Sequence, residues 1–501
     1  MIRNENLHQY LATVATALSG PIMGDLQSTP AKELAGAMLI LLDRIQADLS
    51  SGDAIAATAQ PEWARLKALT AKVVGTELPA SRKQLTSTAD WHALDEEIAT
   101  VQQALGDDAT FGRLVQQLKN GQPEAREWMR GMSALLATIS RDFESHLWPA
   151  ASAPGAQAMP AGIDRNADLK QRLSAYLAQR FPTLPPNPIE RFAIVSGGNS
   201  KLSALLTLAD NDVLPRQLAL RMDIPNTSTP MRLDTEYPVM QRIFALGLPV
   251  PEPILFEPDP AWLGDAFVLM TQITEAKMAG SPFVEDRNHF GAHTAPEFGR
   301  EAAGFLAVLH SKTLEPATAE AQVMRERDAL LAELAADWRP LKKSSFSLAS
   351  DLAIAWLQAH PLPTGRPSCL VHGDYVQHNI LTRDGHIAAV LDWELAMAGD
   401  PAADLAQCKM MLIGGTISWD DFVKSYLAAG GIPAAVDPHA IAWYAVLLYL
   451  KHSVYQGKMR NGFEASGTRS DFKLALISGF FVDRLALYQA EALRDAVAAI
   501  G

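Results

Sequence analysis

The sequence predicts an α+β fold in two lobes, preceded by an all-α N-terminal domain. Three observations predict it. Residues 1–150 carry apolar positions at helical spacing, residues 151–166 are rich in Ala, Pro and Gly, and the pattern after residue 168 runs helix, strands, one helix, more strands and then helices. A chain of 501 residues is also too long for one ordinary domain. We therefore expect a helical accessory domain, a linker over residues 151–166 and the two lobes after it.

The helices of the N-terminal domain are predicted from caps and from spacing. Thr29-Pro30 supplies an N-cap and a first-turn proline, and apolar residues from Leu34 to Leu49 follow on one helical face. A long helix is expected after Pro123, with apolar residues at helical spacing as far as Leu147. No reactive constellation stands out in this domain. Its role is open, and it is a candidate surface for a homo-oligomer.

Composition and charge exclude several classes of protein. The net charge of -13 and the lack of a long basic run argue against nucleic acid as the main partner. No run of 18 apolar residues is present, so we expect no membrane span, and the first residues lack the compact apolar region of a signal peptide. Cys369 and Cys408 are too few for a disulfide framework. We expect a cytoplasmic protein.

The densest chemical signal lies between residues 372 and 394. His372-Gly373-Asp374 is followed by Asn379, then by two β-prone runs joined at Asp384-Gly385, and then by Asp392. An Asp-Gly pair between such runs is a hairpin turn signal. Because adjacent strands lie about 4.8 Å apart, we expect the hairpin to bring Asp392 back beside Asn379. The two side chains can then share an ion.

This arrangement suits phosphoryl transfer to an alcohol. The reaction needs a positioned hydroxyl group, a carboxylate that accepts its proton, and Mg²⁺ to neutralise charge on the polyphosphate. Asp374 is the candidate base, while Asn379 and Asp392 offer the hard oxygen atoms that suit Mg²⁺. The spacing of Asp374 and Asn379 equals that of the H-R-D-x-x-x-x-N catalytic loop of protein kinases, and Asp392 falls where the Asp of D-F-G would follow.

Residues 372–406, and above all the run from Val390 to Ala406, resemble the aminoglycoside phosphotransferase and choline kinase family of small-molecule kinases. The resemblance covers about residues 190–480. It is strongest for the branch that occurs as the N-terminal kinase-like domain of certain mammalian acyl-CoA dehydrogenases and as stand-alone bacterial hydroxyacyl-CoA kinases.

The resemblance implies a bilobal protein-kinase-like fold, with an N-lobe over residues 167–273 and a C-lobe over residues 274–501. It also implies that Asp374 is the catalytic base and that Asn379 and Asp392 are the metal ligands. By the same likeness His372 braces the loop through hydrogen bonds and Asp404 is structural.

The nucleotide-binding elements are expected in the N-lobe. The backbone of the Gly-rich turn Gly197-Gly198-Asn199-Ser200 can approach a polyphosphate closely, because glycine has no obstructing side chain. On the next strand Arg221 would hold the α- and β-phosphates of ATP, and Glu236 on the following helix would orient it. Most kinases use Lys in this place. Backbone groups near Thr271 and Gln272 are predicted to read the adenine edge.

The acceptor is predicted from charge. Residues 451–473 hold five Lys or Arg against Glu464 and Asp471, a local basic excess in an acidic chain. Coenzyme A thioesters carry phosphates and need a basic site, whereas aminoglycosides are polycations and need an acidic one. Lys451, Lys458 and Arg460 are therefore candidate acceptor contacts, with an ordinary solvated helix face as the alternative.

The sequence thus predicts a phosphotransferase that uses ATP and Mg²⁺ to phosphorylate a hydroxyl group of a small molecule, with a hydroxyacyl-CoA or hydroxy acid favoured. An antibiotic kinase of the aminoglycoside type is one alternative, and a catalytically idle nucleotide-binding scaffold is another. The presence of Asp374, Asn379 and Asp392 argues against the idle scaffold. Protein-kinase activity is disfavoured, because residues 392–404 leave no room for a long activation segment.

Overall fold

The structure of the chain is a computed structural model. It describes residues 52, 54–75, 91–147, 163–195, 201–223, 232–280, 295–312, 327–341, 348–363, 365–412, 416–466 and 488–500. Contacts divide the chain into two compact units. The helical unit comprises Met1–Ser152, Arg325–Thr364 and Pro438–Gly501, and the α+β unit comprises Ala153–Met324 and Gly365–Asp437. No helix among the described residues has the length and apolar character needed to cross a membrane.

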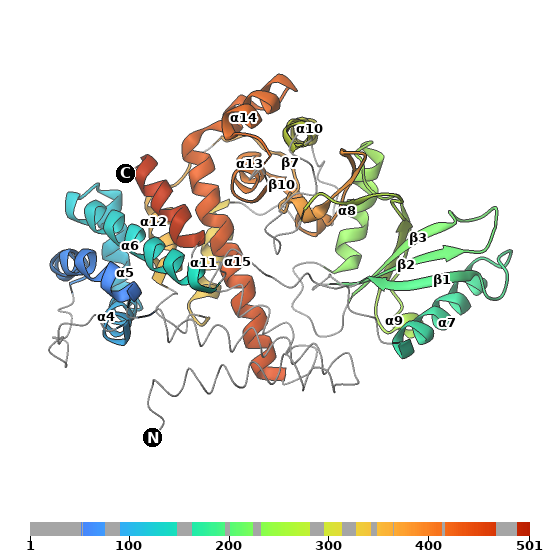
Figure 1. Cartoon of the computed structure of the whole chain (residues 1–501), viewed down its shortest axis with the longest axis horizontal. Coiled ribbons are helices and arrows are strands. Elements are labelled where there is room, and N and C mark those ends of the chain that lie inside the picture. Colours follow the sequence, from blue (N-terminus) through green and yellow to red (C-terminus); the bar gives the residue numbers. More distant parts are fainter. Residues whose placement is uncertain are drawn as a thin grey trace. The chain divides into compact units, whose positions relative to one another are not determined.

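The helices of the helical unit are drawn in Figure 1, and one of them, α12 (Leu348–Ala359), is buried along almost its whole length. The labelled helices of this unit are α4 (Trp91–Ala104), α5 (Asp108–Lys119), α6 (Pro123–Leu147), α11 (Arg327–Trp338), α12 and α15 (Pro438–Ser466). Nearly every residue of α12 is buried, and α4, α5, α6, α11 and α15 all contact it. A helix with so many apolar residues around its circumference must be covered on all sides.

The compact units divide the chain differently from the boundaries drawn from the sequence. Residues 274–501 were expected to form one C-lobe, but residues 325–364 and 438–501 group with the N-terminal helices. The buried surface of α12 explains the difference, because α4, α5 and α6 supply part of its cover. The domain boundaries stay a prediction. The predicted α+β fold behind an all-α N-terminal region is confirmed.

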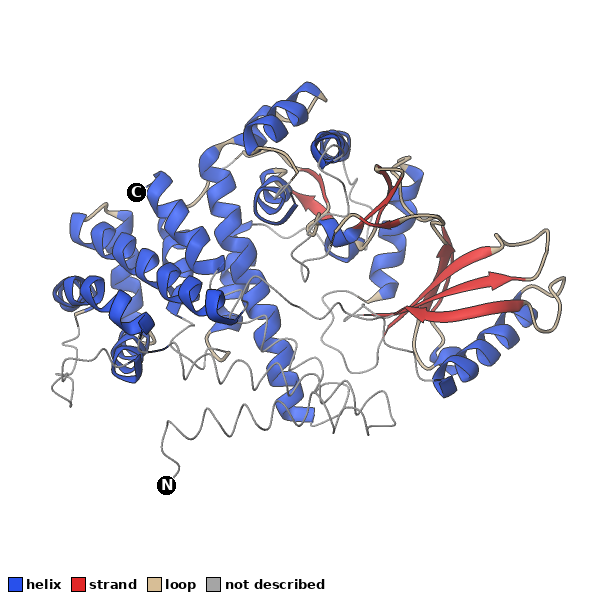
Figure 2. Ribbon diagram, viewed as in Figure 1, coloured by secondary structure: helices blue, strands red, loops and turns tan. Residues whose placement is uncertain are grey.

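The first part of the α+β unit is an antiparallel five-stranded sheet in the order β1-β2-β3-β5-β4, drawn in red in Figure 2. Its strands are β1 (Ile189–Val195), β2 (Lys201–Leu208), β3 (Gln217–Asp223), β4 (Pro253–Glu257) and β5 (Phe267–Thr271). Helices α7 (Ile163–Arg180) and α9 (Pro260–Leu263) join the core on one face, and α8 (Leu233–Ala245) packs against β4 and β5.

Side chains alternate between the two faces of this sheet. The even-numbered residues of β2 and β3, such as Leu206 and Leu220, belong to the core that includes α7. The odd-numbered residues, such as Lys201 and Arg221, therefore lie on the other face, where Val268 and Met270 of β5 pack with α8. Lys201, Arg221 and Asp223 therefore all lie on the same face of the sheet.

The second part of the α+β unit carries the predicted hairpin. Ile380 pairs with Val390, and Asp384 and Gly385 at the turn have φ angles of 53° and 86°, as an Asp-Gly hairpin turn requires. The strands here are β6 (Lys277–Met278), β7 (Cys369–Val371), β8 (Ile380–Arg383), β9 (His386–Val390) and β10 (Met397–Gly399). The helices are α10 (Ala295–His310), α13 (Ala402–Gln407) and α14 (Trp419–Ala428), with the short helices η4 (Gln377–Asn379), η5 (Trp393–Leu395), η6 (Cys408–Leu412) and η7 (Pro433–Val436).

Candidate active site

The structure brings Asp374, Asn379 and Asp392 together at the open end of the hairpin. The Leu391 N–H donates to the Asn379 carbonyl oxygen at 2.7 Å, which extends the ladder beyond β8 and β9 and places Asp392 beside η4. The Asn379 amide nitrogen donates to both the backbone oxygen and the Oδ2 atom of Asp374, each at 2.9 Å. The juxtaposition expected from the Asp384-Gly385 turn is present, and the catalytic roles stay predictions.

Both carboxylate oxygens of Asp374 accept a hydrogen bond from a neutral amide. Asn379 donates to Oδ2, and the Nε2 atom of Gln407 donates to Oδ1 at 2.6 Å. Gln407 ends α13 and is 1% exposed. Each carboxylate oxygen has two lone pairs, so each keeps one for a hydroxyl proton. Gln407 was not predicted, although it lies three residues after Asp404 and thus on the same face of α13.

The backbone of the loop is held by Asp404. Its carboxylate accepts the N–H groups of His372 at 2.7 Å and Gly373 at 2.9 Å. His310 contacts the same carboxylate at 3.3 Å, and the hydroxyl of Tyr426 lies 2.9 Å from the other ring nitrogen of His310. Burial alone would raise the pKa of Asp404, but the bonds from His310 and His372 outweigh it and lower that pKa. An ionised carboxylate therefore anchors the loop.

His372 makes the hydrogen bonds that were predicted to brace the loop. Its Nδ1 atom accepts the Asp374 N–H at 3.2 Å, so Nε2 carries the proton and donates to the Leu391 carbonyl oxygen at 3.0 Å. Burial lowers the pKa of His372, which keeps the ring neutral as both bonds require. His372 thus ties the loop of Asp374 to the strand that leads into Asp392.

Gly373 has no room for a side chain. Its φ angle is 78°, and a Cβ atom added there would lie 2.4 Å from the backbone oxygen of Leu395. Glycine is therefore required on two counts, the left-handed backbone and the close approach of η5.

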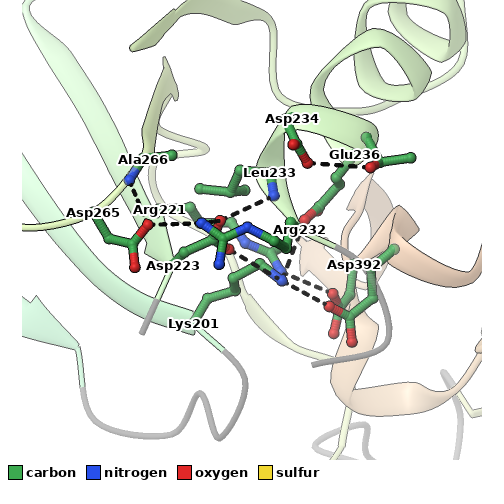
Figure 3. Close-up of polar contacts among 12 residues, drawn as sticks. Lys201, Arg221, Asp223, Arg232, Leu233, Asp234, Glu236, Asp265, Ala266 and Asp392 are labelled. Carbon is green, nitrogen blue, oxygen red and sulfur yellow. Dashed lines mark hydrogen bonds and ion pairs between the residues drawn. The ribbon is translucent and has the colours of Figure 1, made fainter. Parts of the chain in front are cut away.

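Arg221 joins the sheet to the hairpin. Figure 3 shows it between Glu236 of α8 and Asp392, with Nη1 at 3.1 Å from Glu236 Oε1 and Nη2 at 3.0 Å from Asp392 Oδ1. Burial alone would lower the pKa of Arg221, but Glu236, Asp392 and Glu394 outweigh it and raise that pKa. Arg221 and Glu236 are paired as their predicted roles require, and Asp392 is a further partner.

Lys201 and Glu394 were not predicted, and both belong to the same cluster. Lys201 is 2% exposed, and its Nζ atom lies 3.2 Å from Glu394, 3.7 Å from Asp223 and 3.9 Å from Glu236. Burial and the charge of Asp392 raise the pKa of Glu394 to about 7. The sequence position of Lys201 could have indicated its place in the cluster. Lys201 directly follows the Gly-rich turn, and the pairing of β2 with β3 puts it on the same face of the sheet as Arg221.

The residues at this end of the hairpin fit a magnesium ion. Burial alone would raise the pKa of Asp392, but Arg221 outweighs it and lowers that pKa, so the carboxylate is charged. The amide nitrogen of Asn379 is engaged with Asp374, which leaves its oxygen as the ligand atom. The carboxylate of Glu236 is paired with Arg221 and Lys201, so it is not needed as a metal ligand.

The donor set also agrees with the usual coordination of Mg²⁺. The part of the chain that the structure describes holds no group of three His, Cys, Asp or Glu side chains placed to bind a metal ion by themselves. Mg²⁺ is typically held by one or two carboxylates together with substrate phosphates and water, so one Asp and one Asn suffice. Asp392 has a φ angle of 64°, a strained backbone of the kind found at functional sites.

Six further residues were predicted to contact the nucleotide, and the structure describes two of them, Thr271 and Gln272. Gly197, Gly198, Asn199 and Ser200 lie outside the described residues. The Thr271 N–H donates to Glu252 and the Gln272 N–H donates to Gln217. Both amides are thus engaged within the sheet, and contact with adenine would fall to the carbonyl groups.

The three candidate acceptor residues lie on α15 of the helical unit. Lys451 is buried, with its ammonium 5.9 Å from the centroid of the Tyr455 ring. Lys458 is paired with Asp337 at 2.5 Å, and the side chain of Arg460 lies outside the described residues. Their role in acceptor binding stays a prediction.

Comparison with known proteins identifies the family. Residues 192–444, about half of the chain, match the phosphotransferase enzyme family. Acyl-CoA dehydrogenase family member 11 of Gallus gallus is 28% identical over 253 residues, which is 47% of this chain and 30% of that protein. Acyl-CoA dehydrogenase family member 10 of Mus musculus is 29% identical over 243 residues, which is 47% of this chain and 21% of that protein.

A crystal structure of a proposed aminoglycoside phosphotransferase from Ralstonia eutropha is similar to this chain with a TM-score of 0.47 and 18% identity. The similarity covers 65% of this chain and 98% of that one. The chain spans less than a third of the length of the two acyl-CoA dehydrogenase relatives.

A sheet with a buried basic residue on the face toward the hairpin, and a candidate base beside two candidate metal ligands, is the arrangement expected of a phosphotransferase site. With about half of its length matched, the chain belongs to the phosphotransferase enzyme family.

Replacing Gly373 by Ala should displace the loop of Asp374. We expect the variant to lose turnover and to lower the free energy of unfolding, measured by denaturant titration. Gly430→Ala is the matched control, because Gly430 has a φ angle of 90° but no atom within 4 Å of an added Cβ. The control should cost about 1–2 kcal/mol for the left-handed backbone alone. Gly373→Ala should cost about 1–3 kcal/mol more, for the clash with Leu395. Equal effects of the two changes would contradict this account.

Replacing Gln407 by Leu should misorient the base. The variant loses one of the two amide donors to Asp374, so kcat should fall by about ten- to a hundredfold, while nucleotide binding is unchanged. Gln489→Leu is the control, since Gln489 is equally buried but donates to Val446 in the helical unit. A normal kcat in Gln407→Leu would show that Asn379 alone orients Asp374.

Proposed function

We propose that this protein transfers the γ-phosphate of ATP to a hydroxyl group of an acyl-CoA thioester or a related hydroxy acid. The observation that carries the proposal is the Asp374 carboxylate, which accepts hydrogen bonds from the side-chain amides of Asn379 and Gln407 and lies near Asp392. The chain that carries it belongs to the phosphotransferase enzyme family. A hydroxyl proton needs such an oriented acceptor, and a polyphosphate needs the cationic groups beside it.

The sheet face that carries Arg221 supports nucleotide binding. Arg221 lies across from Ser203, which in turn lies across from Val195, and the next row holds Ala219 and Leu205. Val195 is 43% exposed and Leu205 is 37% exposed, so this face offers apolar side chains to a ligand. Apolar surface beside a buried cation suits a molecule with a flat base at one end and phosphates at the other.

In the proposed reaction each residue has a separate task. Asp374 accepts the proton of the attacking hydroxyl through a free lone pair, and Gln407 and Asn379 hold it in place. Arg221 faces the polyphosphate from β3, oriented by Glu236. Asn379 and Asp392 would hold Mg²⁺, which when bound neutralises charge on the phosphates.

The acceptor class rests on the relatives and on local charge. The two curated relatives are named as acyl-CoA dehydrogenase family members, proteins that by name act on acyl-CoA thioesters. The basic excess of residues 451–473 would suit the phosphates of coenzyme A. A cytoplasmic location and self-association through the N-terminal helices stay predictions.

Substitution of the two aspartates should separate the base from the metal ligand. Asp374→Asn should lower turnover by on the order of 10² to 10⁴, the worth of a positioned general base, and should keep Mg·ATP affinity. Asp392→Asn should in addition weaken Mg²⁺-dependent ATP binding, measured by calorimetry. Asp384→Asn, at the exposed turn of the same hairpin, should behave as wild type. Near-normal turnover in Asp374→Asn would contradict the assignment of Asp374 as the base.

An acceptor screen tests the substrate class. ATP consumption should rise with hydroxyacyl-CoA thioesters or free hydroxy acids, and should not rise with kanamycin-like polycations or amino alcohols. The charge of the expected partner is the physical reason, since an acidic acceptor and a polycation need opposite potentials. Product mass should increase by one phosphoryl group. Phosphorylation of the polycations alone would replace the proposed acceptor with an antibiotic and leave the kinase assignment intact.

A further inference from the structure

Lys201 is the most deeply buried cation beside the candidate active site. It begins β2, is 2% exposed, and lies within 4 Å of three carboxylates, those of Asp223, Glu236 and Glu394. Lysine is seldom buried to this degree, because removing an ammonium group from water is costly unless several negative groups surround it. A buried lysine with three acidic neighbours therefore points to a task in their charge balance.

The carboxylates around Lys201 also concern Arg221. Lys201 and Arg221 share Glu236, with contacts at 3.9 Å and 3.1 Å. Arg221 in addition contacts Asp392, the candidate metal ligand, at 3.0 Å. The Nζ atom of Lys201 lies 3.2 Å from the carboxylate of Glu394, which is two residues beyond Asp392. Two cations on adjacent strands thus contact two carboxylates on either side of Trp393.

The charge balance decides what Arg221 can do. Four carboxylates, those of Asp223, Glu236, Asp392 and Glu394, compete for the available cations. Asp223 also forms an ion pair with the exposed Arg232 at 3.4 Å and accepts a hydrogen bond from the N–H of Leu233 at 3.2 Å. The other three carboxylates depend on Lys201 and Arg221 for positive charge. In a buried site such attractions are strong. A guanidinium held by three carboxylates would have little attraction left for a phosphate.

We propose that Lys201 is a positioning residue that neutralises Glu394 and part of Glu236, and so leaves Arg221 and Asp392 able to receive the nucleotide phosphates and the metal ion. This inference rests on the proposed function, because it assigns Lys201 a task in nucleotide binding. Lys201 acts through the carboxylates and does not itself contact the nucleotide. Without it, Arg221 is the one remaining buried cation among the described neighbours of Glu236, Asp392 and Glu394.

The test measures Mg·ATP binding to the full chain by titration calorimetry. Lys201→Met should bind Mg·ATP roughly tenfold more weakly than wild type. Lys201→Arg, which keeps the charge, should recover part of the loss. Lys201→Met combined with Glu394→Gln should bind more tightly than Lys201→Met alone, because one carboxylate fewer competes for Arg221.

Lys170→Met is the matched control. Lys170 belongs to the same unit, and its Nζ atom donates to the backbone oxygen of Glu190 at 3.1 Å at an exposed position. This variant should bind Mg·ATP as wild type does. Thermal melting of every variant identifies changes that come from loss of the fold. If Lys201→Met does not fold, the double variant is compared with Glu394→Gln, and the proposal expects their affinities to agree within about threefold.

Three results would overturn the proposal. The first is wild-type affinity in a folded Lys201→Met variant. The second is a double variant as weak as Lys201→Met, which would mean that Lys201 acts by direct contact with the nucleotide. The third is a wild-type chain that binds no Mg·ATP, which would overturn the proposed function together with this inference. Wild-type binding with an unaffected Lys201→Met variant removes the inference alone.

Discussion

The loop that carries Asp374 takes its shape from the buried carboxylate of Asp404. That side chain is 0% exposed, accepts the N–H groups of His372 and Gly373, and contacts His310. An ionised group so deeply buried is tolerated only when donors surround it, and loss of a donor leaves part of its hydrogen-bonding capacity unmet at a cost in free energy. The left-handed backbone of Gly373 belongs to this anchored turn, whereas the ring of His372 is neutral because burial outweighs the charge of Asp404.

A second constraint is the alternation of side chains along β2 and β3. Even-numbered residues fill the apolar core, so odd-numbered residues, including Lys201 and Arg221, must lie on the opposite face. A shift of register by one residue would bury both cations among leucines. The core therefore fixes the charged face, and the position of Arg221 opposite Glu236 and Asp392 is a consequence of apolar packing.

The hairpin could be predicted from local sequence patterns. Contacts between residues far apart in the chain could not. The Asp384-Gly385 turn sets the meeting of Asn379 and Asp392 over a dozen residues, so periodicity and turn chemistry were sufficient. Lys201 meets Glu394 only through the pairing of separate elements 193 residues apart, and no local signal specifies that contact. The burial of α12 is a similar case, because its apolar sequence requires a cover without saying which helices supply it.

Three aspartates of one small region differ because their surroundings differ. Asp404 accepts bonds on both oxygens from backbone and histidine groups and is closed to solvent, so it can only be structural. Asp374 accepts two neutral amides, which orient the carboxylate without the charge of a nearby cation, so it keeps lone pairs for a proton. Asp392 contacts a guanidinium, and its side chain is 30% exposed, so an ion can still reach it. Burial and the charge of the donors, more than residue type, distinguish the structural anchor from the candidate base and the candidate metal ligand.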